Sequence, residues 1–146
     1  MDARQLEEFI DRAFPNRLTE RHFDVDHVGG RRIRLTLKPQ PWMERPGGSI
    51  SGPTLMGLAD TAAYLLVIAE LGPVAAAVTS NLNIHFLRRP PADVAVTVEG
   101  ELLKLGRRLA LSEVRMFSGD EPEPVAYATV TYAVPSPKPE SRATEP

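Results

Sequence analysis

The stretch that decides the fold is PTLMGLADTAAYLLVIAEL, residues 53–71, which is followed by Gly72 and Pro73. Proline suits the first turn of a helix, where its missing N–H would have no partner, and the Gly-Pro pair is a strong stop signal. The residues between are apolar on nearly every side, which is typical of a helix that other elements enclose. We therefore expect one long buried helix over these residues.

Upstream of this helix the sequence predicts a β-hairpin. Residues 23–28 and 31–38 are separated by Gly29-Gly30, a common pair for a tight turn between two strands. The second arm alternates apolar with polar side chains, so only one of its faces can be buried; the apolar positions are Ile33, Leu35 and Leu37. Residues 39–53 contain four prolines and three glycines and are expected to form a loop.

Downstream of the helix four strand-like runs follow one another, joined by short connections that favour antiparallel neighbours. They cover residues 75–87, 92–105, 108–118 and 124–134. Together with the hairpin they predict an α+β protein in which an antiparallel sheet of five to six strands wraps around one long central helix. That shape is the hotdog fold. We expect an N-terminal helix within residues 1–19, the hotdog domain over 20–135 and a disordered tail over 136–146.

Composition excludes several classes of protein. The 146 residues contain 17 Lys+Arg against 19 Asp+Glu, a net charge of −2 that is too balanced for a dedicated nucleic-acid binder. The sequence has no cysteine, which excludes disulfides, thiolate metal sites and a cysteine nucleophile. Its most apolar uninterrupted run, residues 61–69, is shorter than the roughly 20 residues of a spanning helix. The acidic N-terminus is unlike a signal peptide. These features predict a cytoplasmic protein that binds neither membranes nor nucleic acid.

Four segments resemble a known family, in the same order along the chain. Residues 52–62, GPTLMGLADTA, resemble the central-helix motif of hotdog-fold thioesterases of the phenylacetate-pathway (PaaI-like) type. Residues 78–90 resemble the strand that follows it, and residues 105–110 and 125–132 resemble the last strands. The resemblance implies hydrolysis of an acyl-CoA thioester, without a cofactor because coenzyme A is part of the substrate. It also implies that Asp60 acts as general base or nucleophile.

The resemblance also assigns roles around Asp60. Gly52 would offer its N–H, at a helix N-terminus, to the oxyanion. Gly52 and Asp60 are eight residues apart, roughly 12 Å along a helix, so one chain cannot bring both to the same acyl carbon. In the family the site lies between two subunits, and we therefore expect a homodimer, or a dimer of dimers (homotetramer). Thr79 lies where some relatives position water, although a threonine in a strand is usually structural.

The sequence departs from the family motif at three positions. Ser51 replaces the motif histidine, Pro53 replaces its second glycine and has no N–H, and Arg45 stands where many relatives have asparagine. A serine hydroxyl could orient the thioester carbonyl, but Ser51 could equally be a helix cap. These departures motivate a second hypothesis, a non-catalytic hotdog dimer that binds an acyl-CoA or a related ligand. A hydratase or dehydratase is less favoured, because its usual motif is not recognisable.

Substrate contacts are expected in two places. A basic rim at strand ends would bind the phosphates of coenzyme A, and it consists of Arg88, Arg89, Lys104, Arg107 and Arg108. Arg45 and Thr54, before and at the start of the central helix, are also expected to bind the substrate. The apolar groove for the acyl chain would be lined by Leu55, Met56 and Leu66. His22, Asp24 and Asp26 alternate on one strand face, but outward polar residues are common on edge strands and we expect no metal site.

Overall fold

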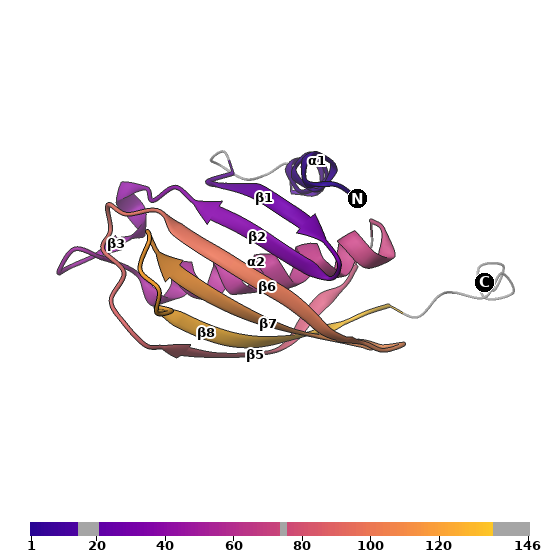
Figure 1. The fold of residues 1–146 in the computed structure, drawn as a ribbon. Coiled ribbons are helices and arrows are strands. Elements are labelled where there is room, and N and C mark those ends of the chain that lie inside the picture. The colour runs from indigo at the N-terminus through magenta and orange to yellow at the C-terminus, as the bar shows by residue number, and fades with distance from the viewer. Residues whose placement is uncertain (15–20, 74–75, 136–146) are drawn as a thin grey trace, which may run out of the picture.

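The computed structural model describes residues 1–14, 21–73 and 76–135. One six-stranded antiparallel sheet curls around α2 (Gly52–Leu71), as Figure 1 shows. The strands, in their order across the sheet, are β1 (Phe23–Gly29), β2 (Arg32–Leu37), β6 (Val96–Leu105), β7 (Leu109–Ser118), β8 (Ala126–Ala133) and β5 (Val78–Phe86). The predicted α+β hotdog fold is confirmed.

The central helix is enclosed because every side of it is apolar. Ser51 caps its N-terminus and Gly72, with a φ of 82°, ends it. By length and composition α2 could cross a membrane, but Ala62, Leu65 and Val67 have no exposed surface. Its apolar character is therefore explained by the core of the protein. β8 supplies alternate buried residues to this core along its whole length, whereas β5 contributes only the half-buried Leu82 and Ile84.

Two details upstream of α2 differ from the predictions. Gly29 pairs with Arg32, so the hairpin turn is Gly30-Arg31 rather than Gly29-Gly30, and both turn residues have positive φ values of 60° and 62°. A β-bulge between Val25 and His27 shifts the register. The expected loop also contains a short 3-10 helix (η1, Pro41–Met43) and a small hairpin of β3 (Glu44–Arg45) and β4 (Ser49–Ile50).

The N-terminal helix α1 (Ala3–Ala13) lies beside β1, as Figure 1 shows. Asp2 and Gln5 form a capping box at its start, and the side chains that it buries are Leu6, Phe9 and Ile10. Glu7 connects this helix to the sheet, because its carboxylate accepts a hydrogen bond from the Val25 N–H (2.8 Å) and pairs with Arg21 (3.1 Å). The tail predicted over residues 136–146 lies outside the described residues.

Candidate functional site

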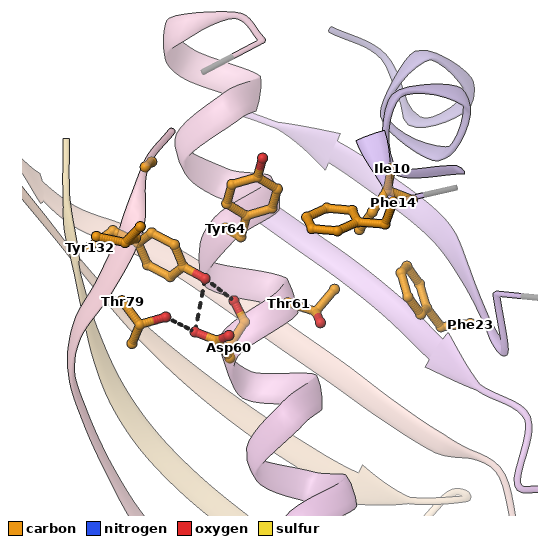
Figure 2. Close-up of a pocket in the computed structure, with 10 residues that line it drawn as sticks. Ile10, Phe14, Phe23, Asp60, Thr61, Tyr64, Thr79 and Tyr132 are labelled. Atoms are coloured by element: carbon orange, nitrogen blue, oxygen red, sulfur yellow. Dashed lines mark hydrogen bonds between the residues drawn. The ribbon is translucent and has the colours of Figure 1, made fainter. Parts of the chain in front are cut away.

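Asp60 lies in the middle of α2, and two hydroxyl groups approach the same oxygen of its carboxylate. Thr79 Oγ1 donates a hydrogen bond to Asp60 Oδ1 (2.5 Å), and the Tyr132 hydroxyl lies 2.8 Å from the same atom (Figure 2). The Tyr132 hydroxyl is also 3.3 Å from the backbone carbonyl oxygen of Asp60. The carboxylate is partly exposed rather than sealed in the core. It therefore has hydrogen-bond partners and access to a ligand.

The sheet brings these groups together through its register. Thr79 of β5 is paired directly with Tyr132 of β8, at the end of the sheet that covers the middle of α2. Alternation along β8 directs Tyr132 toward the helix, on the same face as Ala128 and Val130. The sequence analysis named Asp60 and Thr79 but missed Tyr132. The alternation of residues 126–133 could have indicated that it faces the helix, but not that it meets Asp60.

A cavity of about 580 Å³ opens beside Asp60. Its lining combines elements from α1, β1, α2, β5 and β8, and four of its side chains are aromatic (Figure 2): Phe14, Phe23, Tyr64 and Tyr132. Burial raises the pKa of Tyr64, and burial together with the nearby Asp60 carboxylate raises the pKa of Tyr132. Both hydroxyls therefore stay protonated at neutral pH. The site presents one carboxylate to an aromatic, largely apolar cavity.

The N-terminus of α2 holds the other predicted catalytic residues. Ser51 is the N-cap: its Oγ accepts a hydrogen bond from the Thr54 N–H (3.4 Å) and lies 2.8 Å from Thr54 Oγ1. Gly52 lies against the Phe86 ring at the end of β5, so that an added Cβ would be 3.4 Å from Phe86 Cζ. Asp60 contacts the start of β5 and Gly52 contacts its end. Within one chain the two halves of the expected site are therefore apart.

The predicted cations form two groups at opposite ends of the sheet. Lys104, Arg107 and Arg108 are exposed at the β6–β7 turn, near the end of β8 that carries Tyr132. Arg88 and Arg89 follow the other end of β5, where Arg88 donates to the Pro124 carbonyl (2.7 Å) and pairs with Glu123. None of the five is buried. Within one chain they do not form a continuous basic rim.

The other residues expected to contact the substrate are dispersed as well. Leu55 and Leu66 are buried in the core, each with 1% of its surface exposed, and neither lines the cavity beside Asp60. Met56 is exposed on α2, and Arg45 is exposed on β3. The cavity is lined instead by aromatic residues that the sequence analysis did not select. These come from four separate elements, so no local pattern brings them together.

The structure also places the residues that were considered as metal ligands. Asp24 pairs with Lys38 (3.0 Å), Asp26 accepts a hydrogen bond from Thr36, and the His22 ring packs on Trp42 at 5.6 Å. Over residues 1–14, 21–73 and 76–135, no group of three or more His, Asp or Glu side chains is arranged to hold a metal ion.

Comparison with known proteins decides the family. Residues 47–125, more than half of the chain, match the model of the thioesterase superfamily. The chain belongs to this superfamily. A candidate thioesterase from Silicibacter sp. TM1040 is 37% identical, with 92% of each chain covered and a TM-score of 0.83. A search of curated protein sequences finds no significant match.

More distant structures of the superfamily share the fold. Zebrafish thioesterase superfamily member 2 is 14% identical, with 92% of this chain and 99% of that chain covered, and its TM-score is 0.82. A hypothetical thioesterase from Streptococcus pneumoniae TIGR4, solved with coenzyme A, is 22% identical. That comparison covers 93% of this chain and 98% of that chain, with a TM-score of 0.72. At these identities the likeness concerns the fold alone.

Proposed function

We propose that this superfamily member is an acyl-CoA thioesterase of the phenylacetate-pathway (PaaI-like) type. The observation that carries the proposal is the Asp60 carboxylate, which is partly exposed at the wall of an aromatic-lined cavity and hydrogen-bonded to two hydroxyl groups. A carboxylate beside an apolar cavity suits a substrate that has a reactive carbonyl and an apolar acyl group. The solved complex of the pneumococcal thioesterase with coenzyme A supports a CoA-type substrate.

The reaction needs a proton acceptor beside the thioester carbonyl. As general base, Asp60 takes a proton from water while the water oxygen attacks the carbonyl carbon. The tetrahedral intermediate then expels the sulfur, which leaves as the thiol of coenzyme A once it has received that proton. As nucleophile, the Asp60 oxygen would attack the carbonyl carbon and expel the thiolate of coenzyme A, which takes up a proton from water, leaving a mixed anhydride. Water then hydrolyses the anhydride to the free acid and the Asp60 carboxylate. Thr79 assists both routes because it holds the carboxylate.

The other half of the site is proposed to come from a second copy of the chain. No residue of β5 is buried, and β5 is the last strand on its side of the sheet, so it presents an unpaired strand edge. Thr79 and Phe86 are about 23 Å apart along it. If two copies of β5 paired antiparallel about a two-fold axis at Asn83, Thr79 of one chain would lie close to the partner's Phe86. Asp60 would then face the partner's Gly52.

This two-fold pairing would complete the oxyanion site and the basic rim. The backbone N–H of the partner's Gly52 lies in the first turn of α2, where the helix dipole favours negative charge. Ser51, at the same helix end, keeps an O–H that could donate to the thioester carbonyl. In this dimer the partner's Arg88 and the partner's Arg89 would lie near the end of the sheet that carries Lys104, Arg107 and Arg108. We therefore propose a homodimer, which could assemble further into a homotetramer.

Thiol release from a panel of short, long and aromatic acyl-CoAs tests the proposal. The wild type should release thiol from at least one of them. Asp60→Asn, which keeps the shape but cannot accept the proton, should reduce turnover by about 10²- to 10⁴-fold, the range of general base catalysis. Its elution volume and melting temperature should match the wild type. Turnover that survives this change would exclude Asp60 as base or nucleophile.

A second function, binding without hydrolysis, is favoured by the N-terminus of α2. Ser51 is engaged as the helix cap, and Pro53 has no N–H for an oxyanion. A non-catalytic dimer would be stabilised against heat equally by an acyl-CoA and by its non-hydrolysable thioether, with no thiol released. The cytoplasmic location stays a prediction.

A further inference from the structure

The two hydrogen bonds to Asp60 are unequally shared between its oxygens. Thr79 and Tyr132 both approach Oδ1, at 2.5 Å and 2.8 Å. Over the described residues, no hydrogen bond and no ion pair reaches Oδ2. An aspartate carboxylate turns easily about its last torsion, which has a broad two-fold profile. Two donors on one oxygen therefore define which oxygen is left for a ligand.

Tyr132 is the better fixed of the two donors. Only 4% of its surface is exposed, and its ring packs on Tyr64 with 5.7 Å between the centroids, whereas Thr79 is exposed on an edge strand. Its hydroxyl also reaches the backbone carbonyl of Asp60, so it lies against the helix at two points (Figure 2). Among the residues that the structure describes, the titratable side chains lining the cavity are Asp60, Tyr64 and Tyr132, and none is cationic.

We propose that Tyr132 is a positioning residue, which together with Thr79 holds Oδ1 of Asp60 so that Oδ2 is the reacting oxygen. The inference rests on the proposed function and specifies which carboxylate oxygen of Asp60 reacts. As base, Oδ2 would take the proton from water; as nucleophile, Oδ2 would attack the thioester carbon. Tyr132 thus supports the orientation of Asp60.

Tyr132→Phe removes the hydroxyl and keeps the ring. A misplaced reacting group typically costs about 10²-fold in rate, so we expect kcat to fall by about 10- to 100-fold, while KM stays within about threefold. The change acts on the orientation of the reacting carboxylate rather than on substrate binding, so its effect should fall on kcat and not on KM. A role in packing alone would lower the melting temperature and leave kcat unchanged.

Tyr127→Phe is the matched control. Tyr127 lies on the same strand, β8, and donates to a carboxylate at a similar distance, Glu113 at 2.9 Å, but neither residue lines the cavity beside Asp60. The change removes the same atom and the same type of hydrogen bond. We expect its kcat and KM to match the wild type.

The outcomes separate this inference from the proposed function. If Asp60→Asn is inactive but Tyr132→Phe keeps the wild-type kcat, the positioning role is wrong and the thioesterase stands. If the wild type releases no thiol at all, crystal structures of wild type and Tyr132→Phe still decide the positioning role. One Asp60 orientation in the wild type and more than one, or a rotated one, in the variant would support it; the same orientation in both would overturn it.

Discussion

The two ends of β5 carry opposite halves of the chemistry. At its start, Thr79 contacts a carboxylate and the cavity opens beside it; at its end, Phe86 covers the first turn of α2, which offers backbone N–H groups. The first end supplies a carboxylate that can accept a proton. The second end supplies a helix N-terminus that can stabilise negative charge. The comparison indicates that α2 carries both groups at positions too far apart to meet within one chain, which is why we propose a two-fold pair.

Complementation between two inactive variants would test this division most severely. Asp60→Asn removes the base, and Gly52→Pro removes the N–H at the other end; each homodimer should lose about 10²- to 10⁴-fold in turnover. A mixed dimer keeps one intact site, because the Gly52→Pro chain supplies Asp60 and the Asp60→Asn chain supplies Gly52. Thiol release by co-expressed variants should recover to about a quarter of the wild-type value if mixing is random.

The control is each variant expressed alone, and its homodimer should stay inactive. Recovery in the mixture would also show that Gly52→Pro folds, although a proline directly before Pro53 is unfavourable in a helical conformation. A mixture as inactive as its parents, with mixed dimers present by mass, would mean that both ends act within one chain.

A charged residue in the middle of β5 would weaken the proposed pairing of two chains without changing the residues at either end of the strand. Asn83 is exposed, and in the proposed pairing it lies next to the two-fold axis. Asn83→Lys would bring two like charges together across the strand edge, and we expect the dimer dissociation constant to rise by about tenfold or more. Sedimentation and turnover should be measured over a dilution series. Activity should fall with the dimer fraction, and Thr97→Lys, on β6 three strands away from β5 in the sheet, should leave both unchanged.

Truncating one side chain that lines the cavity would test whether the cavity beside Asp60 holds the acyl group. Phe14 follows the last turn of α1, and its ring meets the Tyr64 ring edge-on at 6.0 Å. Phe14→Ala should enlarge the cavity. The ratio of kcat/KM for a longer acyl-CoA to kcat/KM for a shorter one should then rise by about 10-fold. Competition between two acyl-CoAs in one reaction measures this ratio directly. Met56→Ala, an exposed position on α2, is the control and should leave the preference unchanged.

The fold could be predicted further than the site. The apolar residues 53–71, bounded by Pro53 and Gly72, predicted α2 to within one residue at its start. The hairpin turn was placed one residue early because Gly29 continues β1 and pairs with Arg32, and strand register depends on contacts between strands. The small hairpin before α2 was missed because each of its strands has only two residues.

The site was half predicted. Asp60 and Thr79 were selected by their motif, and the structure joins them by a hydrogen bond, although their catalytic roles stay predictions. Leu55 and Leu66 were selected for the acyl group because they are apolar, and the structure puts both in the core. Periodicity shows that a side chain is apolar and buried, but it does not distinguish the packed side of a helix from the wall of a cavity.

By itself the sequence determined the elements and the enclosed helix, because hydrophobic periodicity, caps and turn residues act over a few neighbouring positions. Only the tertiary structure decided that Tyr132 meets Asp60 and that aromatic rings from α1, β1, α2 and β8 surround one cavity. Tyr132 and Asp60 are 72 positions apart in the chain. Their contact depends on the register of β8 against β5 and on the side of α2 that the sheet covers, and both follow from the packing of the whole core.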